Sequence, residues 1–234
     1  MKMESKKLVD SFQKIVFVAM SYIPLGIACG IALDRIGMTP GGILTMSLLA
    51  FTGAGQFMTS SMIGTGASAI SVITLNLFLS LRMSLMTSSL SQYVRGRSNL
   101  FLALFGQTTA DETYGVNLYQ FEHNPDWSAN NALYANLIAY LTWVVSTWAG
   151  GMIGGAVNIP TTIINYLMTA MFISLMIGNL VSKTFIIAGL TSGILAIILK
   201  IIFQNNLALV FAAVIGSFVG YAIDNRSKEA VLNG

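Results

Sequence analysis

The sequence predicts an all-α fold, a polytopic bundle of about seven or eight membrane-spanning helices, with at least one interrupted or re-entrant helix near Gly53 and Gln56. Two observations predict this class. Only 9% of the 234 residues are charged and 55% are hydrophobic, whereas about 25% of the residues of a soluble domain are charged. The apolar residues also fall into runs of about 20, the length that a helix needs to cross the hydrocarbon core. We therefore expect a single integral membrane domain over residues 1–234 in the lipid bilayer.

Eight apolar segments are expected to form the helices, and polar or glycine-rich stretches separate them. In chain order they cover residues 15–33, 41–63, 67–93, 99–119, 127–151, 161–180, 185–203 and 207–223. Pro24 lies inside the first segment, and Pro160 directly precedes the sixth, where proline suits a first helical turn. We find no internal sequence repeat.

Both ends of the chain are polar. Residues 1–14 are basic, and residues 224–234 form a polar tail. Because lysine and arginine concentrate in cytoplasmic segments, we expect a cytoplasmic N-terminus and a multi-pass protein of the cell membrane. The side of the C-terminus stays open, because the basic residues divide similarly whether or not the second segment crosses. The net charge of +3 comes mostly from residues that flank apolar runs, where they fit lipid headgroups rather than nucleic acid.

The second segment carries the first candidate site. Gly53 and Gly55 lie one residue apart in an apolar run and weaken the helix there. Backbone groups freed by a break in a membrane helix are tolerated where they line a cavity, and transporters use such breaks to hold charged substrates. Thr52 and Gln56 flank the glycines, so we expect all four residues to bind substrate. The alternative is close helix packing through the small residues, with the Gln56 amide bonded to a neighbouring helix.

Arg82 lies well inside the third segment, where a charged side chain costs a few kcal/mol. Its guanidinium keeps its charge in apolar surroundings, so we expect it to bind Asp111, Glu112 or a substrate carboxylate. The alternative is that the helix ends near Met86 and the guanidinium simply reaches the interface. Asn76 in the same segment is a further candidate for substrate binding, and its alternative role is a helix–helix hydrogen bond.

Asp111 and Glu112 are adjacent in the fourth segment. Neighbouring residues on a helix point about 100° apart, so one acid can pair with Arg82 while the other faces a transport pathway. Desolvation favours the neutral form of a carboxyl group, which lets such a group exchange protons near neutral pH. We expect the two acids to couple protons or to bind an amine. The alternative is that the helix ends before Asp111 and both acids are solvated.

Composition excludes several function classes. The single His123 and the single Cys29 provide neither a cluster of metal ligands nor an internal disulfide. The sequence has no glycine-rich phosphate loop followed by lysine, and no nucleophile–base pair is visible. We therefore expect no enzyme activity, no bound metal and no cofactor.

Three motifs occur in a fixed order: residues 50–57 (AFTGAGQF), residues 80–92 (SLRMSLMTSSLSQ) and residues 111–114 (DETY). In order, spacing and chain length the sequence resembles the AzlC-like family, the large subunits of branched-chain amino-acid exporters that are also called BrnF-type. Two positions depart from the family pattern. Ser80 stands where the family often has asparagine, and Ala110 where it often has threonine.

The resemblance implies export of leucine, isoleucine, valine or similar amino acids, driven by the proton gradient. It also implies a small partner membrane subunit of the AzlD or BrnE type, and a higher oligomer is compatible with it. Arg82 or the break at residues 53–56 would take the substrate carboxylate, and Asp111 or Glu112 the amine or the coupling proton. Two other function classes stay open: a channel or ion pore, and a non-transporting scaffold whose buried charges bind a partner chain.

Overall fold

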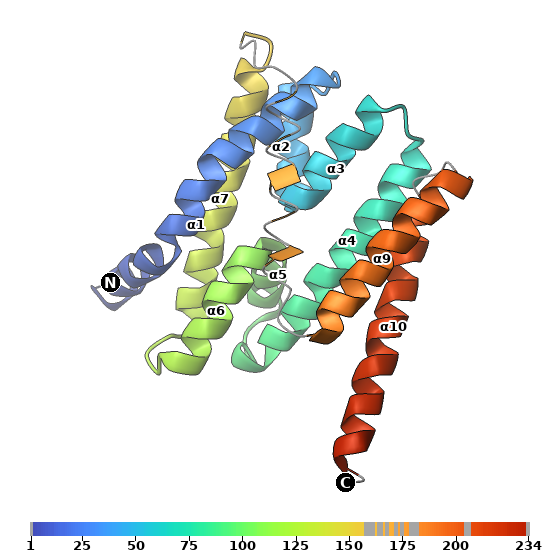
Figure 1. The fold of residues 1–234 in the computed structure, drawn as a ribbon. Coiled ribbons are helices and arrows are strands. Elements are labelled where there is room, and N and C mark those ends of the chain that lie inside the picture. Colours follow the sequence, from blue (N-terminus) through green and yellow to red (C-terminus); the bar gives the residue numbers. More distant parts are fainter. Residues whose placement is uncertain are drawn as a thin grey trace.

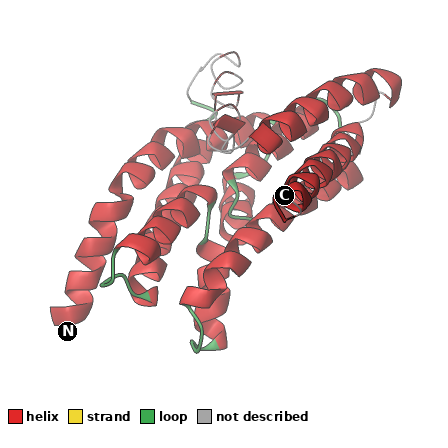
Figure 2. Ribbon diagram, turned by 60° about the horizontal axis from the view of Figure 1, so that its bottom comes forward, coloured by secondary structure: helices red, strands yellow, loops and turns green. Residues whose placement is uncertain are grey.

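The computed structural model describes residues 2–156, 183–203 and 207–232, together with isolated positions at 162, 166, 169, 170, 173, 176 and 177. This described part is helical and contains no strand (Figures 1 and 2). The expected helix at 161–180 lies mostly outside it. The helices are α1 (Lys2–Arg35), α2 (Pro40–Leu49), α3 (Gly53–Gly64), α4 (Ala69–Leu90), the short 3-10 helix η1 (Ser91–Tyr93), α5 (Asn99–Thr108), α6 (Asp111–His123), α7 (Ala129–Ile153), α9 (Lys183–Phe203) and α10 (Leu207–Leu232).

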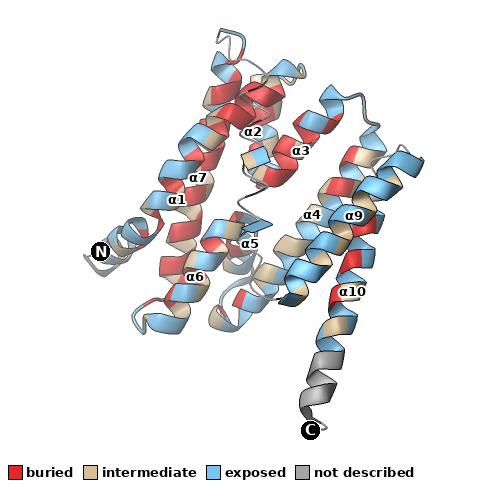
Figure 3. Ribbon diagram, in the orientation of Figure 1, coloured by how far each residue is buried: buried red, intermediate tan, exposed pale blue. Residues whose placement is uncertain are grey.

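By length and composition, three stretches of the described part are long and apolar enough to cross a membrane: Lys6–Arg35, Ala69–Tyr93 and Lys183–Phe203. Buried residues concentrate on α1, α3 and α7, whereas α4 and α9 are mostly exposed or half-buried (Figure 3). Large apolar side chains such as Ile70, Leu85 and Ile201 are exposed. Exposed apolar side chains suit contact with lipid tails, because these tails are as apolar as leucine.

The second expected segment is interrupted, but not at its glycines. Helix α2 ends at Leu49, residues 50–52 are not helical, and α3 begins at Gly53. The hydroxyl of Thr52 accepts a hydrogen bond of 3.3 Å from the backbone N–H of Gly55. This cap stabilises the glycines as the first turn of a new helix, so the break falls just before them.

This segment folds as a helical hairpin rather than as one continuous helix. In α2, Ile43 lies against Gly151, near the end of α7. Helix α3 then returns beside α1, where the hydroxyl of Ser60 donates a hydrogen bond of 2.9 Å to the carbonyl of Ala32. Both ends of the hairpin therefore lie on the side of Arg35, and its tip lies near the middle of the molecule (Figure 1).

The fourth expected segment forms a second hairpin from the opposite side. Helix α5 ends at Thr108 and α6 begins at Asp111. Helix α6 runs in the same direction as α4, because Asp111 meets Arg82 near the middle and Phe121 stacks on Tyr93 at the end, with ring centroids 4.5 Å apart. Both ends of this hairpin therefore lie on the side of η1 (Figure 1).

The two hairpins meet tip to tip. The Gln107 amide donates hydrogen bonds of 3.2 Å and 3.0 Å to the carbonyls of Leu48 and Leu49. The hairpins are also built alike: each follows a long helix, and their arms are 10 and 12 residues in the first and 10 and 13 in the second. A glycine with positive φ, Gly37 or Gly96, precedes each. Residues 2–123 thus form two inverted units that no sequence repeat reveals.

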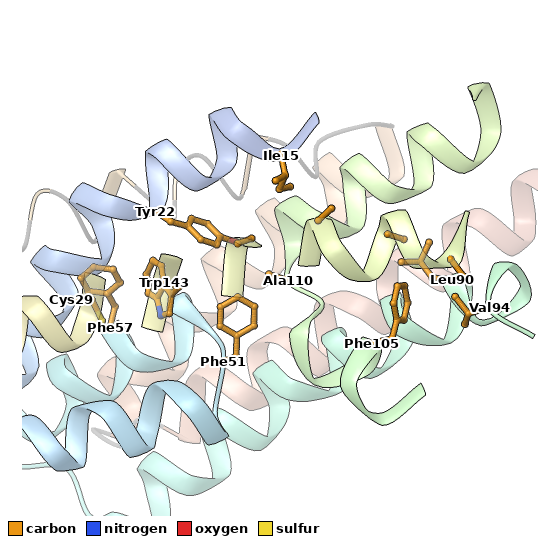
Figure 4. Packing of buried hydrophobic residues seen from close by; sticks show 14 of the residues in the cluster. Ile15, Tyr22, Cys29, Phe51, Phe57, Leu90, Val94, Phe105, Ala110 and Trp143 are labelled. Carbon is orange, nitrogen blue, oxygen red and sulfur yellow. The ribbon is translucent and has the colours of Figure 1, made fainter. Parts of the chain in front are cut away.

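Helices α1 and α7 form the frame that holds both hairpins, and they run parallel in close contact. A Cβ on Gly30 would overlap the backbone of Thr147, and one on Gly150 would overlap that of Ile27. The core around this frame includes Tyr22 and Trp143, whose rings meet edge to face at 5.2 Å (Figure 4). The backbones of α1 and α7 therefore touch because small residues face each other.

The sequence left open the side of the C-terminus, and the C-terminal end of α10 lies on the same side as the N-terminal end of α1 (Figure 1). Helix α10 runs beside α4 and extends into the expected polar tail as far as Leu232. The loop with Arg95 and Arg97 lies on this side too, whereas Arg35 and Lys200 lie toward the other. Most basic residues of the described part are therefore on one side.

We predict that Gly150→Ala destabilises the protein, by about 1–3 kcal/mol for an overpacked site, because the added methyl meets backbone that cannot rotate away. Gly115→Ala is the matched control, since a Cβ on Gly115 of α6 has no neighbour within 4 Å. The measurement is the melting temperature of the purified protein in detergent. Equal melting temperatures for the two variants would contradict the close approach of α1 and α7.

Candidate functional site

A small pocket lies where the tips of the two hairpins face each other. Its volume is ≈ 30 Å³, which is space for about two water molecules. The pocket joins the break of the first hairpin to that of the second, so it unites two motifs that are far apart in the sequence. Its lining residues are Tyr22, Leu25, Phe51, Thr52, Gly53, Ala54, Met83, Ala110, Asp111, Glu112 and Trp143.

The two adjacent acids have different partners. The Asp111 carboxylate forms an ion pair with Arg82, with 2.6 Å between Oδ2 and Nη2, and both side chains are partly buried. The Glu112 carboxylate accepts a hydrogen bond of 2.6 Å from the buried hydroxyl of Tyr22. Helix α4 continues past Arg82 to Leu90, so this arginine binds an acid inside the molecule rather than ending a helix.

Two helix N-termini point toward the pocket. The first N–H groups of a helix lack partners within it and carry a partial positive charge. At α6 this positive charge is compensated by acidic side chains, because Asp111 and Glu112 are the first two residues of the helix. At α3 no acid lies in the first turn, and its first two residues, Gly53 and Ala54, line the pocket. The α3 end is therefore the better place for a ligand's anionic group.

The charges of the pocket do not balance. Arg82 supplies one positive charge, while Asp111 and Glu112 supply two negative charges when both are ionised. Glu112 is exposed, so its carboxylate is accessible to one further positive group, either a proton or a cation. Since Asp111 is already paired with Arg82, Glu112 is the acid left to accept it.

Comparison with known proteins identifies the family. The family model described as AzlC protein matches residues 18–157. The chain belongs to the AzlC family. The match includes both hairpins, α4, α7 and therefore the whole pocket. The family resemblance of the sequence motifs is confirmed.

Relatives of this AzlC-family chain come from bacteria and archaea. It is 26% identical over 214 residues to an uncharacterized membrane protein of Archaeoglobus fulgidus, covering 90% of this chain and 91% of that protein. It is 24% identical over 202 residues to the branched-chain amino acid transport protein AzlC of Bacillus subtilis, with 84% and 77% covered. It is 25% identical over 175 residues to the inner membrane protein YgaZ of Escherichia coli, with 71% and 70% covered. No solved structure matches.

Gln56 lies behind the pocket and does not line it. Its side chain is fully buried, and both amide atoms are engaged. The Trp143 indole N–H donates a hydrogen bond of 2.6 Å to the Gln56 carbonyl oxygen, and the Gln56 amide nitrogen donates one of 2.7 Å to the Ser47 hydroxyl. Gln56 thus ties both arms of the first hairpin to α7, which is the neighbour-bonding role named above as the alternative.

Asn76 and Gly55 also lie away from the pocket, where α3 contacts α4. The Asn76 amide nitrogen donates hydrogen bonds of 3.0 Å to the Thr59 hydroxyl and 2.9 Å to the carbonyl of Val72. A Cβ on Gly55 would lie 2.5 Å from the Asn76 carbonyl oxygen. Of the predicted site residues, Thr52, Gly53, Asp111 and Glu112 line the pocket, and Arg82 lies beside it. The other three, Gly55, Gln56 and Asn76, pack between helices and do not line the pocket.

Sequence reasoning missed Tyr22 and Trp143, which both line the pocket. Tyr22 lies two residues before Pro24, and its hydroxyl in an apolar run was the available signal. Sequence reasoning also missed the hydrogen bonds that link the second hairpin to α7. There the Asn117 amide donates to the Asn136 carbonyl oxygen over 2.8 Å, and the Asn136 amide donates to the Thr109 hydroxyl over 3.0 Å. Each hairpin is therefore anchored to α7 by a buried amide.

We predict that Gln56→Ala lowers stability, by about 1–3 kcal/mol, because it leaves the buried Trp143 N–H without an acceptor. Gln92→Ala is the matched control, since Gln92 is exposed and bonds only the carbonyl of Ser89. Melting temperatures of the purified variants report the difference. A Gln56→Ala variant that melts normally but binds substrate more weakly would return Gln56 to the ligand site.

Proposed function

We propose that this chain is the large subunit of a two-component secondary transporter that exports branched-chain or similar hydrophobic amino acids in exchange for protons. One observation carries the proposal. Two half-helix hairpins from opposite sides meet at a pocket that combines a helix N-terminus with no acid in its first turn, an ion pair, and a carboxylate that is not paired with Arg82. Transporters built from inverted units place their substrate sites at such broken helices. Family membership and the printed name of the Bacillus subtilis relative support the substrate class.

A zwitterionic amino acid needs three kinds of contact, and the groups that line the pocket include each, although the space of ≈ 30 Å³ must widen before it can hold a whole amino acid. The N–H groups at Gly53 and Ala54 suit its carboxylate, since helix N-termini bind anions. The Glu112 carboxylate suits its ammonium group. The rings of Phe51 and Trp143 and the side chain of Met83 suit an aliphatic side chain.

Glu112 also explains exchange for protons. An ammonium group binds the ionised carboxylate, whereas a proton neutralises it, so the two compete for one site. A transporter that must carry one or the other through each conformational change moves them in opposite directions. Asp111 is less suited to this role, because the Arg82 guanidinium already holds it. We therefore assign the coupling proton to Glu112 and a positioning role to the Arg82–Asp111 pair.

The proposed orientation has a cytoplasmic N-terminus in the cell membrane, supported by the basic residues gathered on that side. The small AzlD- or BrnE-type subunit and a higher oligomer enter the proposal through the family resemblance.

The test of transport is counterflow in proteoliposomes. Vesicles loaded with unlabelled leucine should accumulate labelled leucine, isoleucine, valine or methionine transiently, and should not exchange a sugar. The assay is run with and without the small subunit. Leakage of an alkali cation without any exchange of amino acids would indicate a channel and overturn the proposal.

We predict that Glu112→Gln uncouples transport from protons. A one-unit pH gradient is worth about 1.4 kcal/mol per proton, so wild-type protein that exchanges one proton per leucine should sustain about a tenfold leucine gradient. In Glu112→Gln vesicles that ratio should fall to about one, while counterflow at equal pH persists with weaker affinity. Leucine accumulation in response to an imposed pH gradient gives both values. Glu122→Gln, at an exposed acid of the same helix, is the control and should behave as wild type. A coupled Glu112→Gln transporter would exclude Glu112 as the proton carrier.

A further inference from the structure

A larger cavity adjoins the charged pocket. Its volume is ≈ 500 Å³, and its walls come from α4, the tip of the first hairpin, and α5. It shares Phe51, Thr52 and Met83 with the charged pocket, so these three residues are all that the two spaces have in common. The side chains of Phe51 and Met83 are the apolar part of this shared wall.

The cavity leads toward one side of the molecule. One wall extends from Ser80 on α4, close to Arg82 in the chain, to Ser91 of η1 and to Val94, next to the basic loop. That loop lies on the side of the N-terminus (Figure 1). The hydroxyls of Ser84, Thr87 and Ser88 also belong to this wall, because residues three and four apart share one helix face.

The opposite side of the charged pocket is closed. There α2 packs against α7, with the Ser47 and Thr147 hydroxyls 2.7 Å apart and Ile43 against Gly151. Around the pocket, therefore, the larger hollow lies on the N-terminal side. The hydroxyls alone would not indicate water, since the Ser80 hydroxyl already bonds the Asn76 carbonyl at 2.8 Å, as a lipid-facing serine would. The cavity between α4 and α5 is the deciding observation.

We propose that this cavity is a water-filled vestibule through which amino acids reach the charged pocket from the N-terminal side, with Phe51 and Met83 as the gate between the two. The inference rests on the proposed transport function for its role. It adds the route and the conformation: the structure is open toward the N-terminus. A zwitterion must stay hydrated until it reaches fixed charges, and a cavity of ≈ 500 Å³ has room for that water.

Cysteine labelling tests the vestibule independently of transport. Cys29 is the single native cysteine and is fully buried, so the unchanged chain provides the background. The variants Ser84→Cys and Ser88→Cys place a thiol in the cavity wall. Leu85→Cys is the matched control, because Leu85 lies on the same helix, is 73% exposed and does not line the cavity. The reagent is a charged, membrane-impermeant methanethiosulfonate, which reacts only with hydrated thiolate.

The cavity variants should react at least about tenfold faster than Leu85→Cys, and only when the reagent is added on the N-terminal side. Arg95→Cys and Ala69→Cys, in exposed positions at the two sides, report which side the reagent reaches. Cavity cysteines as slow as Leu85→Cys, or reactive only from the side of Ala69, would overturn the vestibule. Leucine counterflow measured on the same vesicles separates the two hypotheses, since labelling without counterflow would refute the transport function and counterflow without labelling would refute only the vestibule.

Discussion

The structure depends on one constraint: peptide groups at a helix break inside a membrane must find partners, because lipid offers none. Each hairpin turns at mid-depth and exposes helix ends there. The Thr52 hydroxyl accepts a hydrogen bond from an N–H of α3. The Gln107 amide of the second hairpin donates hydrogen bonds to the carbonyls of Leu48 and Leu49 of the first. The phenolic hydroxyl of Tyr140 bonds the Leu48 carbonyl as well, at 2.8 Å. The tips stabilise each other, which explains why they meet.

The same constraint accounts for the buried polar residues. Helix α7 binds each hairpin through an amide: Gln56 bonds Trp143, and Asn117 bonds Asn136. Because these amides hold the hairpins in place, the charged groups can lie at the pocket without a role in core packing. These buried amides and the charged groups therefore have different physical roles. The amides cross-link helices, whereas the charged groups lie at the pocket.

The inverted arrangement of the two hairpins bears on how the proposed transporter could open to either side. Because the hairpins enter from opposite sides, a ligand at their tips is close to both sides of the membrane, and a small relative movement of one unit changes which side it can reach. The present arrangement has its larger cavity on the N-terminal side and close helix packing on the other. Under the proposed transport function, competition between a proton and an ammonium group at Glu112 would account for exchange rather than leakage.

The sequence by itself determined the membrane class, the family motifs and the four residues Thr52, Gly53, Asp111 and Glu112 that line the pocket, because burying charge or breaking a helix in lipid is costly enough to be visible in composition. The tertiary structure decided what depends on contacts between distant segments. It showed that the second segment, expected to be interrupted or re-entrant, is a hairpin and that the fourth, expected as a continuous helix, is another. It also showed that Asp111 rather than Glu112 pairs with Arg82, and that Tyr22 completes the site. An apolar run of about 20 residues has the same hydropathy whether the chain crosses the membrane or turns back within it, because hydropathy reports burial in lipid and not the direction of the chain.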